Sequence, residues 1–199
     1  MTFDDIAADV LPLLPQVPQP RAERALLRQA QWLCIKARVW REWTEAVQVQ
    51  GAGEHDMELP AGAQIHIVEA MTVDGKQRPM LPWSFAPAAP DEARGGRIVP
   101  GRLVFQVGDG VPVGSEVRFR VVLKPSEDAT SLPDEVFRPH AALLAEGVIG
   151  LCMSDAARPW SSGDAMAHLS QFVQGVDAVG VREWRGNTDA TPRARIGWC

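Results

Sequence analysis

The sequence predicts an α+β fold: a three-helix bundle into which a small antiparallel β-sheet or partial barrel is inserted, followed by an extended C-terminal tail. Apolar residues recur with the helical period near both ends of the chain and with the strand period in the middle. The bundle is expected from residues 21–50 and 133–185, the β-rich insertion from 55–125 and the tail from 187–199. We treat residues 1–199 as one domain, because a chain of this length can bury one sizeable core.

The first predicted helix begins after the segment LPLLPQVPQP, residues 11–20, whose four prolines favour an extended conformation. From Arg21 onwards one stripe recurs at alternating steps of four and three residues: Leu26, Ala30, Leu33, Ala37, Trp40, Thr44 and Val47. Trp32 and Trp43 lie outside that stripe, so the helix is expected to pack on two sides.

Opposite charges stand four residues apart on the same segment, in the pairs Arg38 with Glu42 and Arg41 with Glu45. Such pairs stabilise an exposed helix by only ~0.2 to 0.5 kcal/mol each. They predict a solvated face on the first helix.

The middle of the chain alternates between apolar and polar residues. AQIHIVEAMTVDGKQRPML contains Asp74-Gly75, a favoured two-residue hairpin turn, so strands are predicted near 64–73 and 76–81. Residues 82–101 are rich in Pro, Ala and Gly and predict a long loop. Alternation then resumes in two sets, each expected to share one strand face: Leu103, Phe105 and Val107, and Val117, Phe119, Val121 and Leu123.

Two further helices are predicted near the C-terminal end. The second carries the stripe Val136, His140, Leu143, Gly147 and Leu151, and the third carries Ala165, Leu169, Phe172, Val176 and Val179. Pro139 is expected to kink or restart the second helix. Gly147 and Gly150 each cost roughly 1 kcal/mol of helix propensity relative to Ala, so they predict the close approach of another helix.

Charge and hydropathy exclude several classes of protein. The net charge is −5, and a general binder of duplex DNA would show a basic excess. We find no apolar run approaching the roughly 18 to 20 residues that cross a bilayer. The N-terminus carries acidic residues where a signal peptide carries basic ones, so the chain is read as intracellular and without a membrane partner.

No catalytic, metal or cofactor site is predicted. The cysteines stand at wide spacing without a C-x-x-C pair, and the histidines are isolated from other ligands. Glu54, Asp56 and Glu58 lack the spacing of a calcium loop and are read as a solvated hairpin edge. There is no G-x-S-x-G motif, although sequence leaves a distant Cys/His pair open. We expect no enzymatic activity.

The order of these pieces resembles the head-to-tail adaptor, or connector, proteins of tailed bacteriophages, in particular the tail tubular protein A type. The resemblance rests on an early helix ending in tryptophans, a β insertion closing in VRFRVVLKP, the segment LPDEVFRPHAALLAEGVIGLCM, and RPWSSGDAMAHLSQFVQGV. It covers nearly the whole chain. The loop at 82–101 and the short tail depart from the family's pattern.

This resemblance implies a structural virion protein of the neck, made in the host cytoplasm. Such adaptors form a ring beneath the portal protein, usually of twelve copies, and bind a tail or nozzle protein on the other side. DNA passes through the lumen during ejection without sequence recognition. The resemblance implies neither a cofactor nor a membrane.

The resemblance also suggests contacts. Trp32, Trp40 and Trp43 are expected at the seam between neighbouring subunits, although all three could instead complete one monomer's core. In the tail, contact with the portal or a neighbouring subunit is expected of Arg193, Arg195, Ile196 and Trp198, because arginine and aromatic side chains are enriched at interface hot spots.

A function of another class stays open beside the adaptor. It is a monomeric β-rich ligand-binding module flanked by helices, in which the loop at 82–101 and Trp83 form a pocket.

Overall fold

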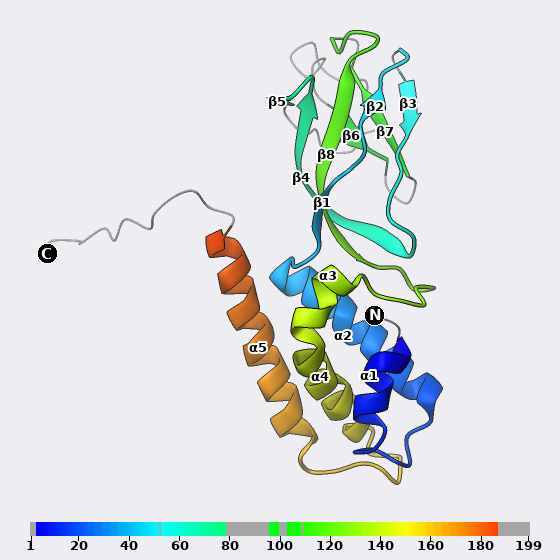
Figure 1. Ribbon diagram of the computed structural model, residues 1–199, viewed down its shortest axis with the longest axis vertical. Coiled ribbons are helices and arrows are strands. Elements are labelled where there is room, and N and C mark those ends of the chain that lie inside the picture. Colours follow the sequence, from blue (N-terminus) through cyan, green and yellow to red (C-terminus); the bar gives the residue numbers. More distant parts are fainter. Residues whose placement is uncertain (1–2, 52, 79–95, 100–102, 109, 187–199) are drawn as a thin grey trace, which may run out of the picture. The chain divides into compact units, whose positions relative to one another are not determined.

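A computed structural model describes residues 3–51, 53–78, 96–99, 103–108 and 110–186 (Figure 1). The chain divides into two compact units. Met1–Val39 and Pro133–Cys199 form a helical unit, and Trp40–Leu132 form a β unit. The β unit therefore interrupts the helical unit in the sequence, and it begins earlier than the predicted boundary at residue 55. The prediction of a mixed fold with antiparallel sheets is confirmed.

The helical unit contains α1 (Phe3–Val10), α2 (Gln19–Ala37), α3 (Asp134–Phe137), a 3₁₀ turn η2 (Arg138–His140), α4 (Ala141–Met153) and α5 (Ala165–Gly186). Helix α4 contacts α1, α2 and α5, and α2 also contacts α5 (Figure 1). The sequence did not predict α1. Residues 11–18 were expected to be extended, but they form turns in which Leu14 N–H donates to the carbonyls of Val10 and Leu11.

The first predicted helix ends at Ala37, so its assignment to residues 38–50 was wrong. Arg38 adopts a left-handed conformation with φ of 53° and donates its N–H to the carbonyl of Cys34, which terminates α2. Up to that point the predicted stripe is correct. Its members are almost completely buried, at 2% exposure or less: Leu26, Ala30, Leu33 and Ala37.

The two glycines of α4 allow close contact with α5, as predicted. A Cβ atom on Gly147 would lie 2.9 Å from ring atoms of Phe172, and one on Gly150 would lie 2.8 Å from Cγ of Leu169. The predicted stripe of α5 is also confirmed in its main part, because Phe172, Val176 and Ala165 are buried. Pro139 restarts the helix through η2.

The helical run Asp134–Met153 is the one described helix whose length and composition would suit a membrane span, with a mean hydropathy of 1.3 over the relevant window. The sequence analysis had found no run of this kind. Within the unit, α4 packs against α1, α2 and α5, and Leu144, Val148 and Cys152 are buried there. Packing on several sides accounts for the apolar composition of a core helix.

The β unit contains two antiparallel sheets. The first has the order β1-β8-β4-β5 with β2 also paired to β8, and the second has the order β3-β7-β6. The strands are β1 (Arg41–Trp43), β2 (Val47–Gln48), β3 (Gly53–Asp56), β4 (Ala63–Val73), β5 (Lys76–Arg78), β6 (Gly96–Ile98), β7 (Val104–Val107) and β8 (Glu116–Pro125).

The predicted hairpin joins β4 to β5. Val73 pairs with Lys76 across Asp74 and Gly75, both of which have positive φ, at 49° and 73°. Positive φ at both central residues is the geometry of a type I′ turn, which suits the twist of the flanking strands. Of the second predicted strand, Lys76–Arg78 form β5, and residues 79–81 lie outside the described residues.

The core of the β unit follows the predicted alternation in β8, where Val117, Phe119, Val121 and Leu123 are buried. The rings of Phe105 and Phe119 meet edge to face, with centroids 4.9 Å apart. Leu103 was expected to share the face of Phe105, but it precedes β7 and is 51% exposed.

Candidate interaction surfaces

The three tryptophans proposed for one seam do not lie on one helix. Trp32 is on α2, where its ring lies 5.4 Å from that of Phe172, centroid to centroid. Trp40 and Trp43 belong to the β unit. The prediction that one helix carries all three tryptophans was therefore wrong, because α2 ends at Ala37, before the second tryptophan.

Trp40 is a core residue of its own unit. It is 1% exposed, and its indole Nε1 donates to Oε1 of Glu42 at 2.6 Å. Its carbonyl accepts from the N–H of Leu123, so the residue extends the pairing of β1 with β8. For Trp40, the alternative that the tryptophans complete the core of one monomer is therefore correct.

Trp43 is 48% exposed at the end of β1. It lines a groove of about 310 Å³ together with two kinds of residue. The acidic ones are Glu42, Glu45 and Glu58, and the others are Thr44, Leu59, Pro60, Val121 and Leu123. We call this the β1 groove. It presents carboxylates, an indole and aliphatic side chains together, which suits a partner with both basic and apolar groups.

Strand β1 lies at the edge of its sheet, and among the described strands it pairs with β8 alone. Trp40 O and Thr44 N–H are both bonded to β8, to Leu123 N–H and Phe119 O. Successive residues of a strand direct their backbone groups to opposite sides, so those of Trp43, next to Thr44, face the outer side of β1. An edge of this kind can accept another strand.

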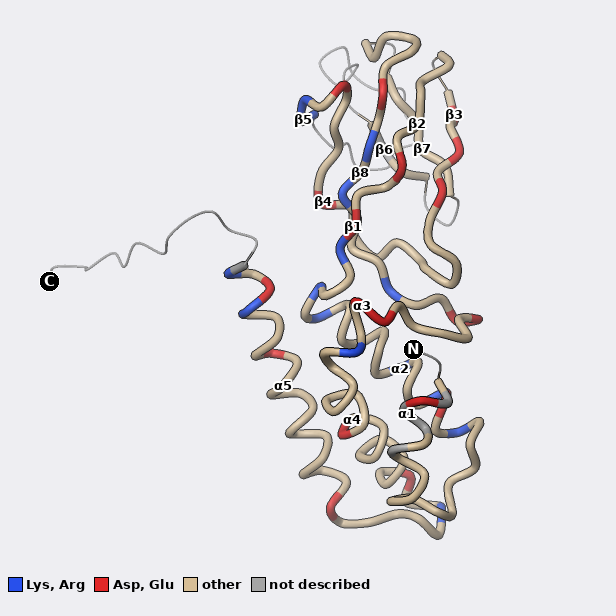
Figure 2. The backbone as a smooth tube through the Cα atoms, viewed as in Figure 1, with Lys and Arg blue, Asp and Glu red and all other residues tan. Residues whose placement is uncertain are grey.

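The charged residues next to β1 form a separate cluster. Glu69 binds two arginines, with Arg41 Nε at 3.1 Å from Oε1 and Arg120 Nε at 3.3 Å from Oε2. The pairs Arg38–Glu42 and Arg41–Glu45 were predicted on a helix, but α2 ends at Ala37 and residues 41–43 form strand β1, so the helical spacing that would pair them is absent. Basic and acidic residues are interspersed along the tube of both units (Figure 2).

Helix α5 carries a second exposed surface. Four large apolar residues at intervals of seven, eight and three are strongly exposed: Met166 at 68%, Val173 at 41%, Val181 at 50% and Trp184 at 65%. These intervals bring them to one side of a helix. We call this the α5 stripe. It is distinct from the buried stripe through Phe172 and Val176, so α5 is apolar on two sides.

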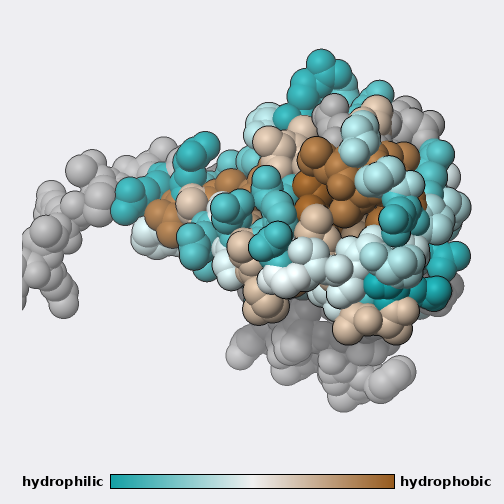
Figure 3. Space-filling view, turned by 90° about the horizontal axis from the view of Figure 1, so that it is seen from below, coloured by the Kyte–Doolittle hydropathy of each residue, from teal (hydrophilic) through white to brown (hydrophobic). Residues whose placement is uncertain are grey.

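A third apolar surface lies at the end of the helical unit where α4 ends. A groove of about 210 Å³ is lined by Leu13, Leu14, Pro15, Gln16, Met153, Pro159, Trp160 and Ser161. Figure 3 shows apolar side chains gathered on this face. Leu13 is 64% exposed, and the buried indole Nε1 of Trp160 has no hydrogen-bond partner among the described residues.

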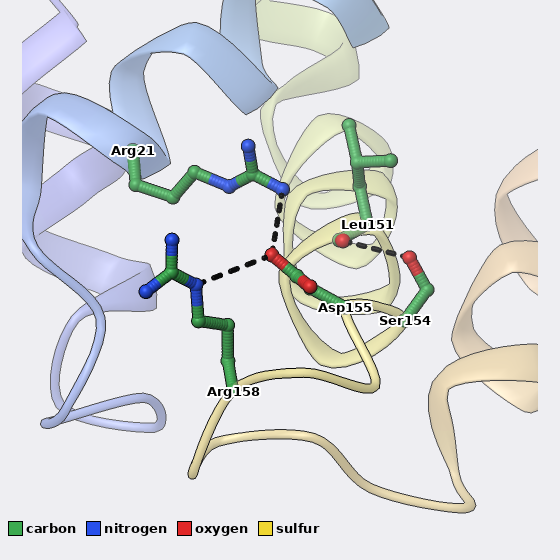
Figure 4. Close-up of polar contacts among 5 residues, drawn as sticks. All are labelled: Arg21, Leu151, Ser154, Asp155 and Arg158. Atoms are coloured by element: carbon green, nitrogen blue, oxygen red, sulfur yellow. Dashed lines mark hydrogen bonds and ion pairs between the residues drawn. The ribbon is translucent and has the colours of Figure 1, made fainter.

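Charged contacts fix the chain beside that groove (Figure 4). Asp155 Oδ2 lies 3.5 Å from Nη2 of Arg21 on α2 and 3.7 Å from Nε of Arg158. Ser154 Oγ donates to the carbonyl of Leu151 at 2.8 Å, at the end of α4. The guanidinium of Arg158 also lies 5.8 Å from the centre of the Trp160 ring. These contacts hold the connection between α4 and α5 against α2.

The ionisable side chains of the described residues form pairs but no metal site. No three His, Cys, Asp or Glu side chains among them meet in a way that could hold a metal ion. Burial raises the pKa of the thiols of Cys34 and Cys152, which keeps them protonated at neutral pH. His168 Nδ1 lies 2.7 Å from Glu146 Oε2, which joins α5 to α4.

Several proposed site residues lie outside the described residues. They are the tail residues Arg193, Arg195, Ile196 and Trp198, and also Trp83. Of the loop predicted at 82–101, only residues 96–99 are described, and they include the short strand β6.

Neither models of known protein families nor curated protein sequences gave a match to this chain.

Proposed function

We propose that the chain is the subunit of a homo-oligomeric ring that joins the portal to the tail of a tailed phage and leaves a channel for DNA ejection. In this proposal the helical unit serves as the adaptor's three-helix bundle, built from α2, α4 and α5. The β unit is the inserted part that faces the tail or nozzle protein. The portal and twelve copies are taken from the family resemblance.

The observation that carries the proposal is the α5 stripe. Large apolar side chains exposed from Met166 to Trp184 of one helix cost solvation free energy unless another surface covers them. Met166 and Trp184 are each about two-thirds exposed, so the described chain does not cover them. A ring subunit needs such a surface, because each copy must contact its neighbours as well as its own core.

The order of the units also supports the proposal. The helical unit is assembled from residues before and after the β unit, as the resemblance requires. The fit of α4 between α2 and α5 through Gly147 gives that unit a close-packed core. Such a core leaves the outer side of α5 available for a second chain.

The test is the mass of the assembly, measured by native mass spectrometry on the full chain alone and with portal rings encoded by the same genome. We expect a ring to form on the portal. A chain carrying Met166→Ser, Val173→Ser and Trp184→Ser should remain folded but form no ring. Val113→Ser is the control, because Val113 is 71% exposed but lies in the β unit.

Two results would count against the proposal. A parent chain that stays monomeric at high concentration with the portal present would contradict the ring. A triple variant that assembles as well as the parent would remove the α5 stripe from the interface, and with it the observation on which the proposal depends.

A further inference from the structure

We propose that the β1 groove receives the C-terminal segment of this chain, residues 187–199, exchanged between copies in the ring. The exchange between copies depends on the proposed function, because it requires that the chain form a ring. The groove itself is described by its own residues, so the fit between segment and groove can be tested separately.

The groove combines three features that together select a basic and apolar strand. Glu45 and Glu58 are exposed on it, and Glu42 is held by the indole of Trp40. Trp43 presents a half-exposed ring, on which a guanidinium can stack. Leu59 and Pro60 supply accessible aliphatic surface for apolar side chains, while Val121 and Leu123 border the groove from the core, at 1% and 0% exposure.

The position of the groove at the sheet edge determines the form of its occupant. The outward backbone groups of Trp43 can pair with an added strand, and the groove lies beside that edge. Addition of a strand supplies main-chain hydrogen bonds, while pockets for alternate side chains supply specificity. The occupant must therefore be extended and must carry different side chains on its two faces.

The sequence PRARIGWC near the end of the chain has this pattern. In an extended strand, alternate residues share a face. Arg193 and Arg195 would then share one face, and Ala194, Ile196 and Trp198 the other. The basic face matches the three glutamates of the groove, and the apolar face matches its aliphatic lining. No acidic residue occurs after Asp189, so residues 190–198 oppose the groove in charge.

The experiment uses the full chain with Arg193→Ala, Arg195→Ala and Trp198→Ala, so that its own segment competes neither for the original groove nor for one in which glutamates are changed to lysine. The probe is a fluorescein-labelled peptide of residues 190–198, and its binding is measured by fluorescence anisotropy. We expect saturable binding. Adding Glu45→Lys and Glu58→Lys should weaken it at least about tenfold, and Trp43→Ala should also weaken it.

Glu54→Lys together with Asp56→Lys is the matched control, because the pair makes the same change of charge on β3 of the same unit. It should alter the affinity by less than about threefold. A peptide with both arginines changed to glutamate should bind the Glu45→Lys/Glu58→Lys chain better than it binds the chain with the original groove. Recovery of binding by this exchange of charges would show that the arginines of the segment contact Glu45 and Glu58.

Equal binding of a scrambled peptide, or an affinity unchanged by Glu45→Lys and Glu58→Lys, would overturn the groove assignment. Binding of a basic portal peptide in place of residues 190–198 would overturn the occupant. A ring that forms without peptide binding would disprove this inference and leave the proposed function intact. If the chain binds the peptide but never forms a ring, the groove still binds this segment, but the exchange between copies is overturned.

Discussion

Gly147 of α4 lies directly against the ring of Phe172 on α5, so close that a Cβ atom on the glycine would fall 2.9 Å from two ring atoms. Phe172 is only 2% exposed and cannot move aside without disturbing the core. Gly147→Ala should therefore lower the free energy of unfolding by about 1 to 3 kcal/mol, even though Ala favours a helix. Urea denaturation of the full chain measures this change.

Gly163→Ala is the control for that substitution, since nothing lies within 4 Å of the position where its Cβ would be. It should leave the urea midpoint nearly unchanged. A Gly147→Ala chain as stable as the parent would show that α4 and α5 can separate at this contact without cost.

Trp40 and Trp43 should respond to the same substitution in opposite ways. Trp40→Ala removes a side chain that is 1% exposed and should cost ~3 to 5 kcal/mol of unfolding free energy in the isolated chain. Trp43→Ala removes a half-exposed ring, so the loss of stability should stay within about 0.5 kcal/mol while assembly weakens. Urea denaturation gives the stabilities, and native mass spectrometry gives the assembly.

The opposite pattern would place the interface elsewhere. If Trp43→Ala unfolds the chain, its ring belongs to the core. If Trp40→Ala leaves stability unchanged, the packing of β1 described above is not the one that stabilises the β unit.

Asp74 should make the β4–β5 hairpin sensitive to acid. Its Oδ1 accepts the backbone N–H of Glu116 at 2.8 Å, and this bond, with a smaller contribution from Ser115, lowers the pKa of Asp74 below its usual value. A lowered pKa contributes stability above the pKa of the unfolded chain, and that stability is lost as the pH falls through the folded value. Asp74→Asn keeps an acceptor and tolerates positive φ, but it does not titrate.

The measurement is the urea midpoint of parent and Asp74→Asn chains between pH 7 and pH 2. The midpoint of the parent relative to the variant should be highest at pH 7 and should fall as the pH drops below about 4. A difference that stays constant over this range would show that the bond to Glu116 does not depend on the charge of Asp74.

Local chemistry accounts for the parts of the fold that the sequence predicted. Asp74-Gly75 specifies a turn by itself, and the steps of Phe172 and Val176 specify the buried side of α5 by periodicity. The glycines of α4 also predicted their close contact, because glycine in a helix is unfavourable unless a neighbour needs the space. These features depend on residues near one another in the chain.

The sequence did not predict where α2 ends, because the residues after Ala37 fit both the helical and the strand repeat. Trp40 and Thr44 continue the helical steps from Ala37, but residues four apart also share one face of an extended chain; in the structure they flank β1, bond to β8 and are buried. What decides between them is the pairing of Glu42 with Val121, a residue far along the chain. For the same reason the β1 groove was not predictable, since Glu58 reaches Trp43 only through tertiary folding.

Deletion of residues 187–199 separates folding from assembly. The described cores of α2, α4, α5 and the sheets are formed by residues before Asn187, so the shortened chain is expected to keep the parent's urea midpoint. Its capacity to form a ring on the portal should fall, because Arg193, Arg195, Ile196 and Trp198 supply the kinds of side chain that dominate interfaces. Native mass spectrometry with portal rings measures this loss.

The full chain with Arg193→Glu, Arg195→Glu and Trp198→Ala is the matched variant, since it changes only three side chains and should show the same defect. Undiminished assembly of both chains would exclude the segment from every contact proposed for it.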